Sequence, residues 1–114
     1  MNTQNKNMND NSEGYQRRIC LVEVACSSIE EYNPPGMTGA YVYVVADAEN
    51  EIQFLQKVRE TLENEMNFPV IEISEIELLT SDREISEALF DSIENLLPHF
   101  PIAFGTFHFF ENDS

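Results

Sequence analysis

Two histidines and two cysteines carry the side chains in this chain that are best suited to nucleophilic chemistry. A histidine activates a cysteine or serine when the two side chains are hydrogen-bonded and a third group orients the histidine. His99 follows Pro98 where a predicted helix gives way to a strand, and His108 lies in an aromatic run. Nothing in the spacing places either histidine beside Cys20 or Cys26. We therefore expect surface or structural histidines and a protein that is not an enzyme.

An acidic segment after the second predicted strand superficially has the spacing of a calcium loop. Asp47, Glu49 and Glu51 occupy its first, third and fifth places, where an EF-hand has oxygen ligands. The glycine required at the sixth place is replaced by Ile52, and the glutamate at the twelfth by Val58. The chain also lacks a CxxC zinc motif and a glycine-rich phosphate loop. We expect no metal and no cofactor, and we interpret Asp47 as a helix N-cap followed by an acidic first turn.

The net charge of −15, from 21 acidic and 6 basic residues in 114, is extreme for a chain of this length. Such a field repels nucleic acids and anionic membranes and attracts cationic surfaces. We therefore expect a basic protein as partner, with no nucleic acid and no membrane. Residues 47–94 hold 14 of the acids against Lys57, Arg59 and Arg83, and Arg59 is spaced to form an ion pair with Glu63 one helical turn on. The alternative interpretation is that the charge serves solubility alone.

Residues 82–95, DREISEALFDSIEN, combine an apolar stripe with a row of acids at helical spacing. The pattern predicts an amphipathic helix that begins with a capping box formed by Ser81 and Glu84. Like charges one turn apart cost a helix about 0.2–0.5 kcal/mol per pair, and acids near its C-terminal end oppose the helix dipole. Local rules are broken most often at functional sites, so the row is the first candidate for a partner-binding surface; otherwise it is a solvated face. This acidic stripe consists of Glu84, Glu87, Asp91 and Glu94.

Two further surfaces are candidates for binding. Residues 27–39, SSIEEYNPPGMTG, predict a long loop, and long loops are often functional. Its residues Glu30, Glu31 and Tyr32 combine charge with an aromatic ring, a mixture suited to an interface. The outer face of the sheet could pair with a second copy of the chain, which would give a homodimer. Its expected members are Tyr41, Tyr43, Phe107 and Phe109.

The pattern along the chain predicts one α+β domain over residues 15–114, preceded by a disordered tail over residues 1–14, which is polar and rich in asparagine. We expect a two-layer α/β sandwich, a relative of the ferredoxin-like fold, in which two helices cover one face of a four-stranded sheet. The last strand is apolar on both faces and is expected to be central. The expected order is β-β-α-β-α-β, with strands at 18–26, 40–46, 70–74 and 102–110, and helices at about 47–66 and 81–96. The predicted core stripe of the first helix is Ile52, Leu55, Val58, Leu62 and Met66.

The cysteines indicate a reducing compartment. If residues 18–26 form one strand, Cys20 and Cys26 are separated by roughly 20 Å, whereas a disulfide needs Cα atoms within about 7 Å. The chain shows no signal-peptide pattern and no apolar run of the roughly 18 residues that a membrane span requires. We therefore expect buried thiols and a cytoplasmic protein.

Residues 39–79 contain a strand, a glutamate-rich helix, the segment Phe68–Pro69–Val70 leading into the next strand, and an acidic exit over residues 72–77. This segment resembles small acidic bacterial proteins, among them immunity proteins that neutralise a cognate toxin. The resemblance implies an inhibitor of a basic toxin or nuclease, such as one encoded next to it, and brings no catalytic residues with it. The alternatives are a DNA-mimic or anti-defence protein and a small-molecule-binding regulatory domain. A ligand pocket for the latter is expected near Gly36–Gly39 or Gly105.

Overall fold

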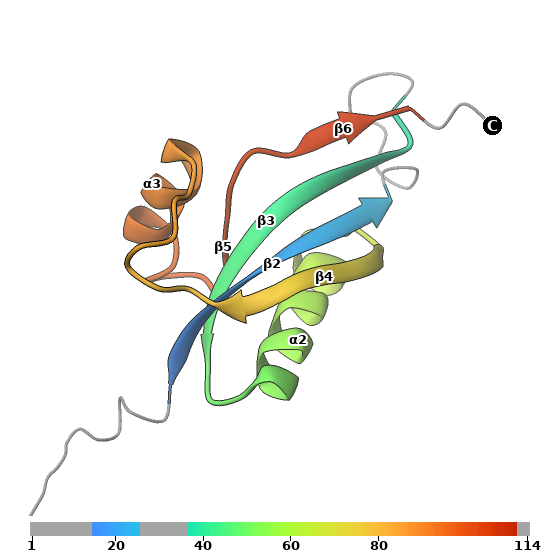
Figure 1. The fold of residues 1–114 in the computed structure, drawn as a ribbon. Helices are drawn as coiled ribbons and strands as arrows, with labels where there is room; N and C mark the ends of the chain where they lie inside the picture. Colours follow the sequence, from blue (N-terminus) through green and yellow to red (C-terminus); the bar gives the residue numbers. More distant parts are fainter. Residues whose placement is uncertain (1–14, 26–36, 112–114) are drawn as a thin grey trace, which may run out of the picture.

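The computed structural model describes residues 15–25 and 37–111. They form a small α+β fold in which five strands make one antiparallel sheet and two helices pack against it (Figure 1). The predicted tail 1–14 lies outside the described residues. So do Cys26 and most of the predicted loop, including Glu30, Glu31 and Tyr32. Within the described ranges, no helix has both the length and the apolar character needed to cross a membrane.

The centre of the sheet is a long antiparallel pair. Strand β2 (Gln16–Ala25) pairs with β3 (Gly39–Ala48) along its whole length. Strand β4 (Val70–Leu78) pairs with the other side of β2. The short strands β5 (Ala103–Phe104) and β6 (His108–Phe110) both pair with β3. The resulting order is β4-β2-β3-β5, with β6 also on β3.

The prediction of one central strand over residues 102–110 is wrong. The segment forms two short pieces at the outer side of β3, separated by residues 105–107. This segment is apolar on both faces for a reason other than a central place in the sheet. Phe107 leaves the sheet and stacks on Phe68, with ring centroids 5.1 Å apart, so it is half-buried without a neighbouring strand.

The first helix begins later than predicted. α2 (Glu51–Glu60) continues into a π-helical turn, η3 (Thr61–Glu65), which brings the helical segment close to its predicted end. Its N-cap is Asn50, whose side chain accepts a hydrogen bond from the Gln53 amide at 2.8 Å. Asp47 is not the cap, because β3 continues to Ala48. Of the predicted core stripe, Val58 and Leu62 are fully buried, and Leu55 and Met66 pack half-buried against them. Ile52 is wrong, because it is 73% exposed and Phe54 fills the core in its place.

The second helix, α3 (Glu87–Asn95), also begins later than its predicted start. Ser86 is its N-cap, and its hydroxyl oxygen accepts a hydrogen bond from the Leu89 amide at 3.1 Å. The predicted capping box is therefore wrong, and both Ser81 and Glu84 lie in the segment that precedes the helix. Leu89 and Ile93 form the buried side of α3, as the spacing predicts.

The two helices pack on opposite faces of the sheet, as Figure 1 shows. Neighbouring residues of a strand point to opposite faces. Cys20 and Val44 belong to the cluster that packs under α2, whereas Ile19 and Val45 belong to the cluster under α3. The expectation of two helices on one face of a two-layer sandwich is therefore wrong. We call the side under α2 the covered face and the side under α3 the open face, because α3 packs over only one end of it.

Strand β4 forms one edge of the sheet, and its register with β2 shifts at two places, one at Ile71 and one at a bulge around Glu75. Ser74 pairs with Leu21 and Glu77 pairs with Ile19, so two residues of β4 stand opposite one residue of β2. Glu75 lies in this bulge with φ 53°, in the left-handed region. A bulge bends and twists the strand locally. It thereby turns the Glu75 side chain toward the open face.

Candidate partner-binding surfaces

The acidic stripe lies on the exposed side of α3 and of the segment before it. Glu87, Asp91 and Glu94 are exposed on the helix, and Glu84 is exposed three residues upstream of it. Phe90 lies among them and is 53% exposed. The structure therefore places all four predicted residues in solvent and adds an aromatic ring that sequence reasoning missed. The sequence does indicate this exposure, because Phe90 does not share the helical spacing of the buried residues Leu89 and Ile93.

The stripe is poorly neutralised by the rest of the molecule. Within the described part of the chain, none of its four carboxylates forms an ion pair, and the last turn of α3 contains no basic residue. The pKa of Arg17 is raised mainly by its hydrogen bond to Asp47. The Glu94 carboxylate lies close enough to contribute to this rise. By contrast, the predicted pair on the first helix is confirmed, because Arg59 and Glu63 form an ion pair at 3.6 Å.

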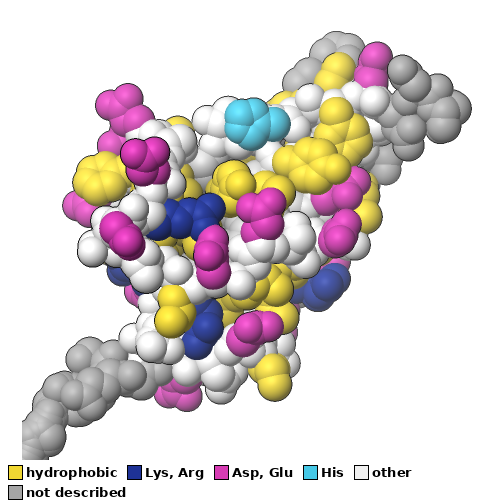
Figure 2. Space-filling model, viewed as in Figure 1, with side chains coloured by type: hydrophobic (Ala, Val, Ile, Leu, Met, Phe, Trp, Pro, Cys, Tyr) yellow, Lys and Arg dark blue, Asp and Glu magenta, His cyan; other side chains and the backbone are white. Residues whose placement is uncertain are grey.

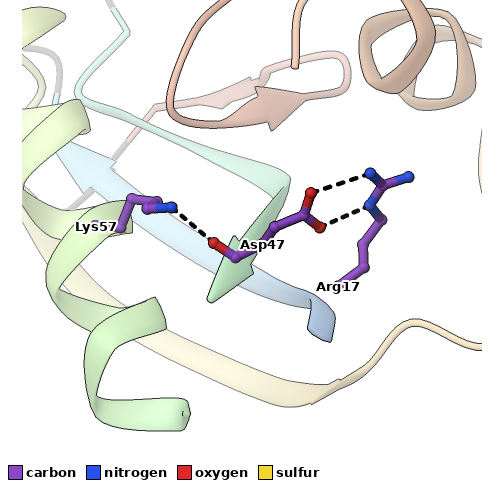
Figure 3. Close-up of polar contacts among 3 residues, drawn as sticks. All are labelled: Arg17, Asp47 and Lys57. Carbon is purple, nitrogen blue, oxygen red and sulfur yellow. Dashed lines mark hydrogen bonds and ion pairs between the residues drawn. The ribbon is translucent and has the colours of Figure 1, made fainter. Parts of the chain in front are cut away.

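Asp47 is a structural residue (Figure 3). Its carboxylate accepts two hydrogen bonds from Arg17, at 2.8 and 3.1 Å, across the β2–β3 pair. Its backbone carbonyl accepts a hydrogen bond from the ammonium of Lys57, a residue in the last turn of α2, at 2.6 Å, which ties α2 to the end of β3. Both groups that a cation would need are therefore engaged. Across the described ranges, no cluster of three or more His, Cys, Asp or Glu side chains is arranged to hold a metal ion.

The histidines and Cys20 do not form a catalytic pair. Cys20 is fully buried on the covered face, and this burial raises its pKa to about 12. His108 is exposed and pairs in register with Tyr41, a residue of the open face, and His99 is exposed after α3. A protonated, buried thiol is a poor nucleophile.

The predicted outer sheet face is split between the two sides of the molecule. Tyr41 and Tyr43 lie on the open face, as predicted. Phe107 and Phe109 pack against the cluster under α2 and belong to the covered face. The aromatic partner of Tyr41 is instead Phe110, with ring centroids 5.1 Å apart. The prediction failed because residues 105–107 leave the sheet. The residues of β6 therefore point to the opposite faces from those expected for one continuous strand.

The open face combines aromatic and acidic side chains. Tyr41 is 42% exposed, and Glu23 stands directly opposite Glu72 in the β2–β4 register. Like charges in directly opposed positions destabilise a sheet, so this pair breaks a local rule as the acidic stripe does. Figure 2 shows hydrophobic, acidic and histidine side chains next to one another between α3 and β6.

A polar network joins the open face to the segment before α3. The Tyr43 hydroxyl donates a hydrogen bond to the Glu75 carboxylate at 3.1 Å, and this bond raises the pKa of Tyr43. The Arg83 guanidinium lies 5.7 Å from the centroid of the Tyr43 ring. Arg83 also forms an ion pair with Glu77. The bulge at Glu75 is therefore fastened to β3 across the intervening strand.

Two hollows flank α3 on this side of the molecule. One, of about 670 Å³, lies between Phe90 and the ends of β2 and β4. The other, of about 400 Å³, lies where a pocket is predicted, at Gly105. The alternative location fails at Gly39, because a Cβ there would stand 2.5 Å from Cζ of Phe110, and Gly36 lies outside the described residues.

Comparisons with protein-family models, with curated proteins and with solved structures find no match to this chain.

Proposed function

We propose that this protein binds a basic protein and acts as a non-enzymatic inhibitor of the immunity type. The observation that carries the proposal is the half-exposed Phe90 ring set among Glu87, Asp91 and Glu94. Interfaces commonly join an aromatic anchor to a surrounding polar rim. In α3 the ring supplies apolar area, and the carboxylates select a cationic partner.

Electrostatics support a basic partner. The carboxylates of α3 repel one another, and Glu94 in the last turn also opposes the helix dipole. Arg or Lys side chains of a partner would relieve both costs. Charge complementarity also steers association, so binding is fast and sensitive to salt. The opposed Glu23 and Glu72 extend the same negative field over the open face.

The inhibitor role draws on the resemblance of residues 39–79 to acidic immunity proteins. That segment corresponds to β3, α2, η3 and β4, which form the scaffold, whereas the proposed contact lies on α3. An immunity protein must cover a toxin without chemistry of its own, and an exposed acidic helix suits a basic toxin or nuclease. The buried Cys20 thiol fits the cytoplasmic location that the proposal assumes.

The test is a comparative capture experiment in extract of the native host, at low and at high salt, read by mass spectrometry. The wild-type chain is compared with the double variant Glu87→Lys/Asp91→Lys and with Phe90→Ala. The matched control, Glu60→Lys/Glu65→Lys, also reverses two exposed charges, but on α2 and η3 behind the opposite face. We expect one basic protein, for instance the product of a neighbouring gene, to be retained by the wild type and by the control. High salt and both α3 changes should deplete it.

Two outcomes would contradict the proposal in different ways. If the α3 variants and the control retain the basic protein equally, the acidic stripe is not the contact surface. If the wild type retains no salt-sensitive basic protein, the inhibitor function is wrong.

The remaining functions have less support. A DNA mimic needs carboxylates in place of phosphates, and the exposed Phe90 and Tyr41 rings among the acids favour a protein surface instead. A homodimer through the open face would bring Glu23 and Glu72 of two highly acidic chains together, and light scattering would detect it. A small-molecule regulatory domain is favoured by one observation, the pocket at Gly105.

A further inference from the structure

The pocket at Gly105 lies between the start of α3 and the open face of the sheet. Its volume is about 400 Å³. Buried Ile19 and Leu89 form its floor together with half-buried Ile85. A Cβ at Gly105 would lie against two lining residues, 3.4 Å from Cβ of Leu89 and 3.5 Å from Oγ of Ser86, so a larger side chain here would take up part of the pocket. The pocket thus has an apolar floor and a glycine in its wall.

The rim of the pocket is polar and accepts hydrogen bonds. The exposed residues Glu84, Ser86, Thr106 and His108 line it. A carboxylate and two hydroxyl oxygens can accept hydrogen bonds from a ligand that carries several N–H donors. An apolar floor beneath a ring of acceptors suits a ligand with an aliphatic stem and a cationic head.

The charges in and around the pocket favour a cationic ligand over an anionic one. Arg83 lines the pocket, but its guanidinium is engaged by the Glu77 carboxylate and lies over the Tyr43 ring. Glu84 at the rim and Glu75 beyond the Tyr43 hydroxyl add two further negative charges. The local balance is therefore negative, like that of the whole chain.

We propose that this pocket receives one arginine side chain of the basic partner, an inference that rests on the proposed function. The arginine stem packs on Ile19, Ile85 and Leu89, and its guanidinium donates to Glu84 and to the hydroxyl oxygens of the rim. Arginine fits better than lysine, because its planar head presents five donors to acceptors that lie around a rim. Arginine is also among the residues most enriched at interface hot spots.

The pocket is continuous with the acidic stripe. Glu84 belongs to both, and Ser86 at the rim is the N-cap that immediately precedes Glu87. A single basic surface can therefore fill the pocket and cover α3 at the same time. The pocket would fix the register of the partner, and the stripe would attract it.

In the first test, small probe molecules are titrated into the full chain. Binding is monitored by NMR through the shifts of the amide resonances. Butylguanidinium, pentanoate and pentanol have similar chain lengths but carry positive, negative and no charge. We expect butylguanidinium to shift the amides of Gly105, Thr106 and Leu89 and to bind about tenfold more tightly than either other probe. Equal or tighter binding of pentanoate would overturn the inference.

The second test uses variants of the pocket. Glu84→Gln should weaken butylguanidinium binding by about threefold to tenfold, and Gly105→Val, which fills the pocket, should abolish it. The control Glu60→Gln makes the same charge change on α2 and should leave binding unchanged. Where Gly105→Val does not fold by its melting curve, Glu84→Gln decides the result. Unchanged probe binding by Glu84→Gln, or by a folded Gly105→Val, contradicts the inference.

The capture experiment separates this inference from the proposed function. If Gly105→Val is folded and retains the basic partner as tightly as the wild type does, the arginine pocket is wrong and the inhibitor function stands. If the wild type captures no basic protein, both are wrong, whatever the probes bind.

Discussion

The two faces of the sheet are formed by the same strands but serve different purposes. The covered face carries the larger cluster, which includes Val22, Val42, Phe54, Val58 and Leu62, all fully buried. The open face has a small cluster around Ile19 and Leu89, and beyond α3 it presents Tyr41 and paired glutamates to solvent. Each strand alternates between the two environments. Stability and recognition are therefore carried by alternate residues of the same segments.

This division teaches where substitutions should be tolerated. A change on the covered face removes packing from the main core, whereas a change on the open face alters exposed surface. Binding properties can then vary without loss of the fold. The predictions below test this division, beginning with the largest effect.

Phe54→Ala should lower the free energy of unfolding by about 3–5 kcal/mol, because it leaves a cavity beneath α2. Its counterpart on the open face, Tyr41→Ala, should cost less than about 1 kcal/mol, since the ring is 42% exposed. Urea unfolding followed by circular dichroism measures both. Similar losses for the two variants would abolish the distinction between the faces.

Gly39→Ala should destabilise the protein by about 1–3 kcal/mol through overpacking. A Cβ at Gly39 would lie 2.5 Å from Cζ of Phe110 and 3.0 Å from the Val24 carbonyl oxygen. The double variant Gly39→Ala/Phe110→Leu should recover part of the loss, which a double-mutant cycle in urea measures. Additive losses would instead mean that the contact with the Val24 carbonyl oxygen, and not the Phe110 ring, prevents a larger residue at position 39.

Stability should fall as pH rises above 9, in part because of Cys20 on the covered face. Burial raises the pKa of Cys20 from 9.0 to about 12, so the unfolded chain loses this proton first. The contribution is fully present below pH 9 and is lost between pH 9 and 12, by up to about 1.4 kcal/mol per pH unit. The hydrogen bond to Glu75 raises the pKa of Tyr43 and acts in the same direction.

Unfolding of Cys20→Ala in urea across the alkaline range isolates the thiol, because Tyr43 is unchanged in it. The variant is expected to be less stable than the wild type at pH 8 but to lose less stability between pH 9 and 10.5. Parallel curves for the two proteins would mean that the thiol does not titrate differently on folding.

Ser86→Ala should cost about 1 kcal/mol, because it removes the N-cap of α3. Ser81→Ala, the same change at the cap expected from the sequence, should stay within about 0.5 kcal/mol. Hydrogen exchange of the α3 amides, measured beside urea unfolding, should show the Ser86 effect most strongly there. Equal effects at the two serines would argue that the helix begins earlier.

Sequence reasoning found the elements that depend on local patterns. The buried positions of α3, the exposed acidic stripe and the Arg59–Glu63 pair all follow from spacing along the chain. Both helix starts were misplaced, because Asp47 and Ser81 are acceptable caps and only the extent of the neighbouring structure selects Asn50 and Ser86. Which face each helix covers could not be predicted, because spacing identifies an apolar side but not the surface that it meets.

The bulge in β4 helps to explain how this edge strand, with its exposed apolar residues, avoids pairing with a second copy of the chain. An edge strand offers unpaired backbone groups to any neighbouring chain, and Ile71 and Leu78 are exposed on this one. The bulge at Glu75 breaks the regular spacing of those groups, and the surrounding glutamates repel a second copy. Removing Glu75 would leave only the register shift at Ile71 and would shorten the interval between the exposed apolar residues. The expected outcome is a chain that stacks edge to edge into fibrils.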